Sequence, residues 1–562
     1  MDWNYEYVNQ KLFPAVRGVW TIKGIAEETA SLGDQVYLID AVTGRHYSYA
    51  ESNALANRIA HSLLALGLRK GDRIGVYLRN KPEYVFTLFA IGKAGLVEVP
   101  ININLREPEI LHMVNNAEIS TIFVEDDPDF LEKLVGVARE TPVLKNVVVQ
   151  GKAGLPPLSG LQIKVVSLDE MIESADDANP KVKVDPEDNY CIFFTSGTTG
   201  LPKGAPITNK TFVLAAQSIC ATPVNRESRN YTCLPLFHAN AQLYSMTAMR
   251  CLGASLVLSD RFSPKKFWKE INDYQATYFN SIGGMMQILD AAFGPEEVPE
   301  HPARFVFVGG TPVALWERFE KKFKVEVFEG YSMSEAPVLF GNFHPDQNKR
   351  KVGSFGKPLF IDLGREIKVV NDQDEEIKVG IGELLQRGVD FITKGYWNAP
   401  EANKEAFDAD GWFRTGDLVR IDEDGYFYFV DRKKFMIRVA GENVSAFEVE
   451  DVVNSHPAVA QSAAIPVPDQ VREEEIKVFI KLKEGVSGID PAEIIKHCAA
   501  RLAYFKLPRY VEIVGDFPKT ATERIQKVQL KNLEKEKKDH GWDRNAEIPG
   551  WRKELYICNQ TG

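Results

Sequence analysis

The sequence has few cysteines and no long apolar run, and each absence excludes a class of protein. Its 562 residues include only 6 cysteines, without CxxC or Cys/His spacing, so neither a disulfide framework nor a zinc site is expected. No run of about 18 apolar residues occurs, so no transmembrane segment is predicted. The first residues lack a basic region followed by an apolar stretch, which argues against a secretory signal. A reducing, cytoplasmic location fits these features best.

An excess of basic residues is also absent. Lys and Arg number 67 against 78 Asp and Glu, a formal net charge of −11, whereas a nucleic-acid partner normally requires a concentrated basic face. No nucleic-acid partner is therefore expected. The hydrophobic share of 44% is that of an ordinary soluble protein, and the length allows roughly three or four domain-sized units.

Helical and strand patterns alternate along most of the chain. Residues 54–68 have helical apolar spacing and residues 73–78 read as a strand, and a second alternating set covers 190–338. Such alternation predicts an α/β fold with doubly wound parallel sheets. Short strands and turns after Lys357 predict a small β unit, and the pattern from Lys434 onward predicts a small α+β domain. We therefore expect an N-terminal part, residues 1–433, and a C-terminal domain, residues 434–562.

Two further segments read as surface features. Residues 151–160 are rich in Pro and Gly, which predicts an exposed connection. The segment after Lys531 is highly charged, so it is predicted to be a peripheral tail.

The strongest local signal is CIFFTSGTTGLPKG, residues 191–204. An apolar strand leads into a loop whose glycines let backbone N–H groups turn toward an anion. Hydroxyl groups and one lysine add donors and positive charge, which is the chemistry of a triphosphate cradle. The string differs from the Walker P-loop, because its lysine follows Leu-Pro. The candidate phosphate-binding residues are Thr195, Ser196, Gly197, Thr198, Thr199 and Lys203.

Further motifs follow this loop in order. They are LFHAN at 236–240, VGGTP at 308–312, FEGYSMSE at 328–335, TGD at 415–417, DR at 431–432 and RVAGENVS at 438–445. Together with the glycine-rich loop they resemble the motifs of the acyl-adenylate-forming superfamily, which includes acyl-CoA synthetases, firefly luciferase and peptide-synthetase adenylation domains. The resemblance runs from about Tyr49 to Lys531.

The resemblance implies an AMP-forming acyl-CoA synthetase that uses ATP, Mg²⁺ and coenzyme A with a small carboxylic acid. His238 and Glu335 would be catalytic, and Thr195 and Glu335 would bind the metal ion. Besides the loop, the implied ATP- and AMP-binding residues are Gly309, Gly310, Thr311, Glu329, Gly330, Tyr331, Ser332, Met333, Ser334, Asp417 and Arg432. Ser332 and Ser334 stand where relatives usually have Gly and Thr.

The small domain is mobile in this superfamily, and the resemblance places its hinge at Lys434. The implied coenzyme A contacts are Arg438, Ala440, Gly441 and Glu442. A homodimer is left open.

The pattern breaks near the C-terminus. Relatives carry a motif like PKTxxGK, whose lysine bridges the carboxylate and the α-phosphate, whereas this chain has Arg524 in the lysine position. Arginine is not interchangeable with lysine at a tight site. Three explanations compete: Arg524 does the work, Lys527 reaches in from about one helical turn later, or adenylation is slow.

The acid is the least defined part of the prediction. The candidate acyl-pocket residues are His238, Asn240, Gln242, Ser281, Gly283, Gly284 and Met285. The details resemble the crotonobetaine/carnitine–CoA ligase branch, so a short functionalised acid is expected, with medium-chain fatty acids as the nearest competitor. The alternatives are an adenylation enzyme that loads a carrier protein and a nucleotide-binding protein with impaired turnover.

Overall fold

The structure is a computed structural model. It describes residues 4–151, 163–174, 176–195, 201–344, 346–439, 442–469, 471–486, 488–519, 525–535, 537, 540–551 and 555. The predicted connection at 152–160, loop residues 196–200, Ala440, Gly441 and Arg524 lie outside them.

The chain forms two compact units. The larger unit comprises Met1–Thr311, Leu315–Ile367 and Gln386–Arg414, and the smaller comprises Pro312–Ala314, Lys368–Leu385 and Thr415–Gly562. These two units are groups of residues that pack compactly together, whereas the predicted boundary at Lys434 is the position of a hinge between moving domains. That boundary therefore stays a prediction.

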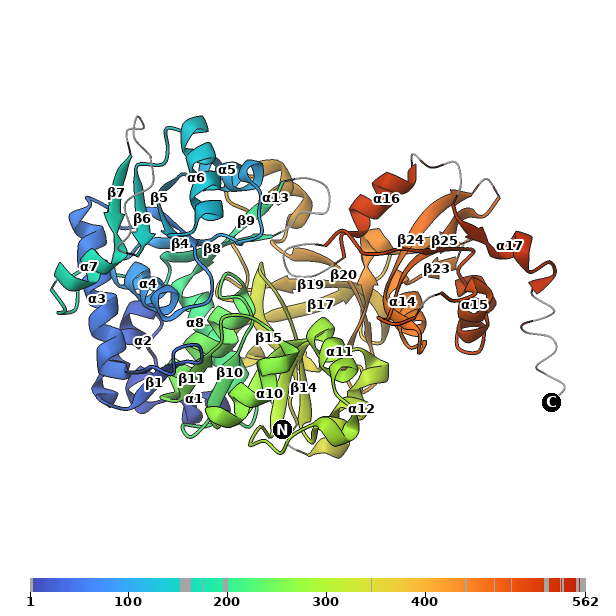
Figure 1. Ribbon diagram of the computed structural model, residues 1–562, viewed down its shortest axis with the longest axis horizontal. Coiled ribbons are helices and arrows are strands. Elements are labelled where there is room, and N and C mark those ends of the chain that lie inside the picture. Colours follow the sequence, from blue (N-terminus) through green and yellow to red (C-terminus); the bar gives the residue numbers. More distant parts are fainter. Residues whose placement is uncertain are drawn as a thin grey trace. The chain divides into compact units, whose positions relative to one another are not determined.

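The larger unit contains two sheets that are parallel except at their edges (Figure 1). One runs in the order β16-β15-β14-β13-β12-β10-β11-β1-β2 and the other β7-β6-β5-β3-β4-β8-β9. The strands of the first sheet are β1 (Val36–Asp40), β2 (His46–Ser48), β10 (Arg229–Thr232), β11 (Ser255–Leu258), β12 (Tyr278–Ile282), β13 (Phe305–Gly309), β14 (Glu326–Met333), β15 (Ala336–Asn342) and β16 (Lys357–Pro358). The strands of the second are β3 (Arg73–Tyr77), β4 (Val97–Pro100), β5 (Ile119–Glu125), β6 (Asn146–Gln150), β7 (Lys164–Ser167), β8 (Asn189–Thr195) and β9 (Lys203–Thr208).

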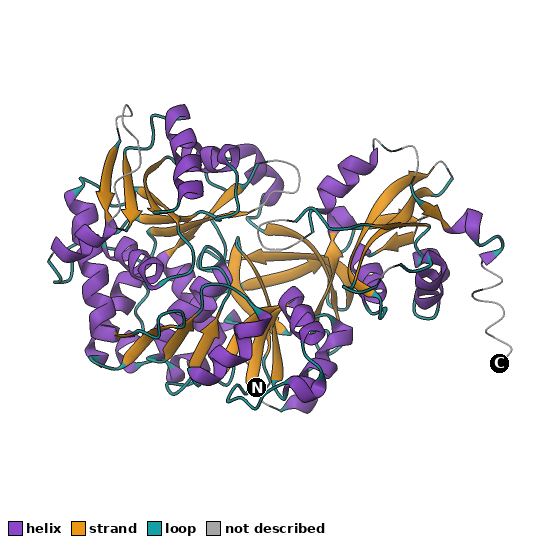
Figure 2. Cartoon of the chain, viewed as in Figure 1, coloured by secondary structure: helices purple, strands orange, loops and turns teal. Residues whose placement is uncertain are grey.

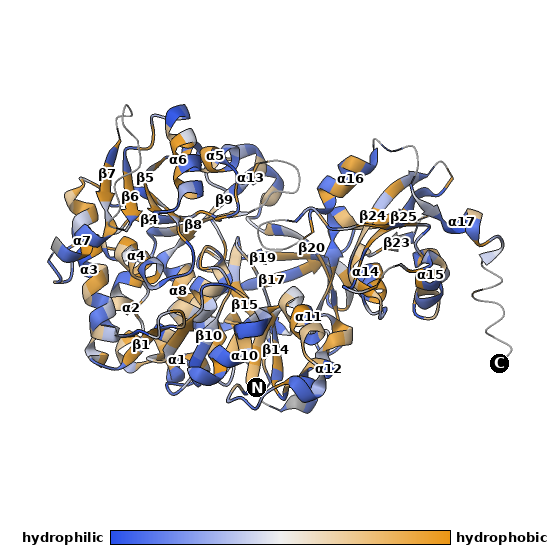
Figure 3. Cartoon of the chain, viewed as in Figure 1, coloured by the Kyte–Doolittle hydropathy of each residue, from blue (hydrophilic) through white to orange (hydrophobic). Residues whose placement is uncertain are grey.

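Helices flank these strands (Figure 2). They are α1 (Tyr5–Lys11), α2 (Ile22–Thr29), α3 (Tyr49–Ala65), α4 (Pro82–Lys93), α5 (Glu107–Asn116), α6 (Pro128–Glu140), α7 (Leu168–Ser174), α8 (Asn209–Ser218), α9 (Ala248–Leu252), α10 (Pro264–Asp273), α11 (Gly283–Ala292), α12 (Val313–Phe323) and α13 (Pro400–Ala406), with the π-helix η4 (Asn240–Thr247) before α9. The predicted doubly wound α/β fold is confirmed. Inner strands such as β5 and β6 are buried and hydrophobic (Figure 3), as expected for strands covered on both faces.

A five-stranded sheet, β18-β17-β19-β20-β21, and a second sheet in the order β23-β22-β25-β26-β27, with β24 paired to β25, complete the fold. Their strands are β17 (Glu366–Val370), β18 (Glu376–Ile377), β19 (Gly380–Arg387), β20 (Phe413–Ile421), β21 (Phe427–Arg432), β22 (Ile437–Val439), β23 (Glu442–Val444), β24 (Val459–Asp469), β25 (Glu473–Leu482), β26 (Tyr510–Ile513) and β27 (Trp542–Asp543). The helices here are α14 (Ala446–Asn454), α15 (Pro491–Ala499), α16 (Lys527–Lys535) and α17 (Arg544–Glu547). Within the described residues, every helix is too short or too polar to cross a bilayer.

The charged C-terminal segment is not peripheral, which corrects the prediction for it. Glu534 and Arg544 are 4% and 1% exposed, and Trp551 packs in the core of the smaller unit. The fully buried Lys477 on β25 lies 2.7 Å from Glu534 and 2.6 Å from Glu512. Buried opposite charges therefore hold α16 against the sheet.

We expect Lys477→Met to destabilise the smaller unit by about 3 kcal/mol, because the buried Glu534 would lose its fully buried cation and keep only the more exposed His540 and Lys537. The matched control is Lys481→Met on the same strand, whose pair with Asp516 is exposed and should contribute roughly 0–1 kcal/mol. Amide hydrogen exchange in α16 and β25 of the full chain measures both effects. Equal effects of the two substitutions would contradict the prediction.

Candidate active site

The glycine-rich loop connects two strands of one sheet. β8 and β9 are antiparallel and pair Thr195 with Lys203, so the loop joins them as a hairpin. Thr195 Oγ1 donates to the Lys203 carbonyl at 3.4 Å. The predicted strand before the loop is confirmed. The two candidate residues that flank the loop, Thr195 and Lys203, lie at the same end of the hairpin.

Glu335 lies close to this hairpin through one tyrosine. The hydroxyl of Tyr396 donates to Glu335 Oε1 at 2.8 Å, and Lys203 Nζ lies 5.4 Å from the centre of the Tyr396 ring. The backbone N–H of Trp397 donates to the Gly204 carbonyl at 2.7 Å. The segment around Tyr396 thus joins the predicted phosphate loop to the predicted metal ligand.

Tyr396 is not among the site residues predicted from the sequence. It lies in the stretch TKGYWN, where a lysine, a glycine and aromatic residues resemble an ordinary surface turn. Tyr396 is recognised as a site residue only from its contacts with the Glu335 carboxylate and the Lys203 ammonium group.

Glu329 fixes the glycine pair at the end of β13. Its carboxylate accepts from the backbone N–H of Gly310 at 2.7 Å and of Thr311 at 3.0 Å, and from the Thr311 hydroxyl. Gly310 has a φ of +79°, which favours glycine. Burial raises the pKa of Glu329 to about 7. The structure thus places Glu329 as the support of this loop.

The rest of this motif is packed among aromatic residues. A Cβ on Gly330 would lie 2.7 Å from the Phe307 ring, so this position has no space for a side chain. Tyr331 stacks on Phe355 with 4.6 Å between ring centres. The Ser332 hydroxyl lies 2.8 Å from the hydroxyl of Tyr244, which connects the motif to η4; Met333 and Ser334 follow at the end of β14.

His238 and Asn240 lie at the start of η4. The half-buried His238 donates its backbone N–H to the Pro235 carbonyl at 3.0 Å, and its ring packs against Phe237. Asn240 Oδ1 accepts from Asn280 Nδ2 at 3.0 Å. The segment of His238 and Asn240 therefore contacts β12, which carries the predicted pocket residue Ser281.

The other predicted acyl-pocket residues differ in exposure. Gly284 is exposed, and an added Cβ there would meet open space. Ser281 and Gly283 are buried, and Met285 packs with its sulfur 3.8 Å from Cys233. Gln242 is fully buried and directs its amide to Glu98 and to the Leu236 carbonyl, both at 2.8 Å. The structure therefore places Gln242 in the interior, where its amide donors already have protein partners.

The ribose candidates form a pair in the smaller unit. Asp417 and Arg432 are opposite each other on β20 and β21, and Arg432 Nε lies 2.8 Å from the buried Asp417 carboxylate. Lys433 pairs with Glu383 at 3.0 Å. An open pocket of ≈ 300 Å³ is lined by Thr415, Gly416, Arg432, Lys433 and Lys434. This cationic pocket can accept an anionic or hydroxyl-rich ligand.

The remaining predicted contacts also lie in the smaller unit. Lys434 is in a single 3₁₀ turn, Lys433–Phe435. Arg438 and Glu442 are exposed on the paired strands β22 and β23. Lys527, the first residue of α16, is paired with Glu450 at 2.7 Å and lies over the Phe435 ring. Burial raises the pKa of Glu450, which the Lys527 ammonium opposes.

The family model described as "AMP-binding enzyme" matches residues 25–397, and "AMP-binding enzyme C-terminal domain" matches residues 448–524. The crotonobetaine/carnitine–CoA ligase of Salmonella paratyphi A is 32% identical over 511 residues, which covers 89% of this chain and 96% of that protein.

Two solved structures extend this similarity. An anthranilate CoA ligase in complex with anthranoyl-AMP has a TM-score of 0.83 and 26% identity, covering 92% of this chain and 97% of that one. The o-succinylbenzoate CoA synthetase of Bacillus subtilis with its acyl-adenylate intermediate has a TM-score of 0.77 and 26% identity, covering 92% and 98%.

Tyr396→Phe removes the hydroxyl group but keeps the ring beneath Lys203. We expect ATP binding in the presence of magnesium to weaken roughly 10- to 100-fold, because a hydrogen bond to a charged group contributes about 1.5–3 kcal/mol. The control is Tyr428→Phe, whose hydroxyl donates to Asp422 at 3.0 Å in the smaller unit. Isothermal titration calorimetry measures both variants, and unchanged binding by Tyr396→Phe would refute the assigned role.

Proposed function

The chain belongs to the AMP-binding enzyme family, and from this membership we propose that it is an AMP-forming acyl-CoA ligase. The predicted superfamily is confirmed. The observation that best supports the reaction is the contact of Tyr396 with both Lys203 and Glu335, because it brings a cation and a buried carboxylate to the end of the glycine-rich hairpin.

The proposed reaction has two steps. An oxygen of the acid attacks the α-phosphorus of ATP, and the bond to the leaving pyrophosphate breaks. The thiolate of coenzyme A then attacks the acyl carbon, a thioester forms and AMP leaves. Lys203 would stabilise negative charge on the phosphates in the first step, and Asp417 with Arg432 would hold the ribose hydroxyl groups.

Magnesium is part of the proposal. The hydroxyl of Thr195 and the carboxylate of Glu335 are oxygen donors of the kind that Mg²⁺ prefers, together with substrate phosphates. When bound there, the ion would neutralise phosphate charge. The hydroxyl of Tyr396 orients the carboxylate by its hydrogen bond.

A short functionalised acid is the proposed substrate class. The relatives named above act on crotonobetaine or carnitine, on anthranilate and on o-succinylbenzoate, all of which carry a polar group besides the carboxylate. The contact between Asn240 and Asn280 offers amide groups beside the predicted acyl pocket. A cytoplasmic location also belongs to the proposal and is supported by five buried free thiols among the described residues; a homodimer stays a prediction.

A panel assay tests the function. Purified protein with Mg·ATP, coenzyme A and crotonobetaine, carnitine, anthranilate or octanoate should release AMP and form a thioester in equal amounts with at least one acid. Lys203→Ala and Glu335→Ala should each slow AMP release roughly 100-fold or more. Acyl-AMP without thioester would favour the carrier-loading alternative. No AMP with any acid would overturn the proposal.

A second experiment distinguishes whether Arg524 or Lys527 is the catalytic cation. Because Lys527 is paired with the buried Glu450, we expect Lys527→Met to impair AMP release by leaving that carboxylate unpaired. Adding Glu450→Gln should then restore at least half of the rate, whereas Arg524→Ala should abolish adenylation in either background. If the double variant stays inactive while Arg524→Ala is active, Lys527 is the catalytic cation.

A further inference from the structure

Glu98 is a carboxyl group buried in the interior of the larger unit, outside all the motifs of the predicted site. It is 0% exposed on β4. Its Oε1 accepts from Gln242 Nε2 at 2.8 Å and from the Tyr84 hydroxyl at 3.2 Å. β4 pairs with β8 at Cys191, so Glu98 adjoins the strand that leads into the glycine-rich loop. A buried carboxyl group is costly unless it is hydrogen-bonded, which indicates a specific role.

Gln242 connects Glu98 to the loop that carries His238. Its Nε2 also donates to the Leu236 carbonyl at 2.8 Å, while the Leu236 N–H donates to Asn80 Oδ1 at 2.8 Å. Asn80 Nδ2 in turn donates to the Leu234 carbonyl at 2.9 Å. Two buried amide side chains therefore hold residues 234–236 from both sides, directly before His238.

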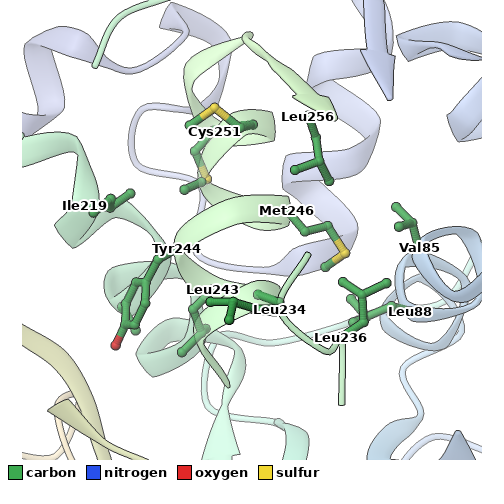
Figure 4. Packing of buried hydrophobic residues seen from close by; sticks show 14 of the residues in the cluster. Val85, Leu88, Ile219, Leu234, Leu236, Leu243, Tyr244, Met246, Cys251 and Leu256 are labelled. Carbon is green, nitrogen blue, oxygen red and sulfur yellow. The ribbon is translucent and has the colours of Figure 1, made fainter. Parts of the chain in front are cut away.

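The π-helix η4 is fixed on its other side as well. Leu243 and Met246 belong to the apolar cluster that includes Val85 and Leu88 of α4, while Tyr244 points away from these two (Figure 4). The Tyr244 hydroxyl lies 2.8 Å from the Ser332 hydroxyl and is also hydrogen-bonded to the Pro337 carbonyl. π-Helical turns are frequent at functional sites, since they change the direction of side chains within a helix. This one carries Asn240 to Asn280 and Tyr244 to the Ser332 motif.

The protonation of Glu98 fits its surroundings. Burial raises its pKa to about 8, and the titratable groups around it are Tyr84, Cys191 and Tyr190, whose own pKa values burial also raises. Glu98 Oε2 and Gln242 Oε1 are both buried, and neither has a hydrogen-bond partner among the described residues. A proton on the acid would supply the donor that these two oxygens lack, and would complete an acid–amide pair.

We propose that Glu98 is a positioning residue for the acid-binding part of the active site, acting through Gln242 on residues 236–240. The proposal builds on the proposed ligase function for its kinetic readout only. Glu98 touches no reacting atom; it fixes the direction in which His238 and Asn240 leave the interior. Ionisation of Glu98 would replace the donor with a second charge-bearing acceptor and loosen the segment.

Two variants separate this role from simple core packing. Glu98→Ala removes the acceptor, whereas Glu98→Gln mimics the protonated acid and keeps Gln242 with its two donor hydrogens for residue 98 and the Leu236 carbonyl. The matched control is Glu270→Gln, since Glu270 is another buried carboxyl group that accepts from a tyrosine, Tyr231, at 2.9 Å.

The kinetic readout uses the acid of the panel with the fastest AMP release. We expect Glu98→Ala to raise the KM for the acid at least tenfold and the KM for ATP less than twofold, with near wild-type values for Glu98→Gln at pH 7. Above pH 8 the wild-type KM for the acid should rise, because Glu98 ionises there, while that of Glu98→Gln should stay constant. Equal increases in both KM values, or a pH profile shared by wild type and Glu98→Gln, would overturn the proposal.

Hydrogen exchange of the ligand-free protein provides a readout that needs no turnover. Amides of residues 236–247 should exchange at least tenfold faster in Glu98→Ala, and at the wild-type rate in Glu98→Gln and Glu270→Gln at pH 7. This measurement remains decisive if no acid of the panel is activated, so the failure of the proposed function and the failure of the positioning role are distinguishable. Should Glu98→Ala not fold, a rise in wild-type exchange relative to Glu98→Gln above pH 8 tests the same contact, and equal rates would reject it.

Discussion

The hydrogen bond from Gln242 to Glu98 joins the two sheets of the larger unit where the candidate site is formed. Glu98 belongs to the sheet that carries the glycine-rich loop, whereas Gln242 lies on the π-helix between β10 and β11 of the other sheet. Apolar packing sets the distance between such layers but not their register, because it is not directional. A buried polar contact with two fixed partners is directional, and so it can define how the loop with His238 meets the phosphate-binding strand.

Most of the fold follows from local pattern. β3 coincides with the strand predicted at 73–78, and α3 covers most of the helical pattern at 54–68 and begins after Ser48, whose hydroxyl caps the helix. The charged C-terminal segment could not be read in this way. Its charges appear solvated in the sequence, yet Lys477, far away in the chain, provides the partner that allows Glu534 to be buried. Long-range ion pairs leave no periodic signal.

The candidate site was predictable where a motif contains its own chemistry. Asp417 and Arg432 lie together as their motifs imply, and Glu335 is close to the hairpin of Lys203. The type of a residue did not show, however, which way its side chain points. Gln242 suggested a pocket contact because it is polar and follows His238, but its amide faces the interior. Glu329 supports the Gly310 turn from the same motif that the resemblance assigns to nucleotide binding.

The catalytic cation of the C-terminal motif cannot be identified from the charges in the sequence alone. Chemistry at the α-phosphate needs a positive group, and both Arg524 and Lys527 carry one. Lys527 already compensates Glu450, whose carboxyl group also accepts from the backbone N–H of Ala464 at 2.5 Å inside the smaller unit. Moving Lys527 to a phosphate would therefore cost the pairing of a buried carboxylate. Because Lys527 is already paired with Glu450 inside the smaller unit, it is a poor candidate for the cation that binds the substrate. This pairing favours Arg524 for that role.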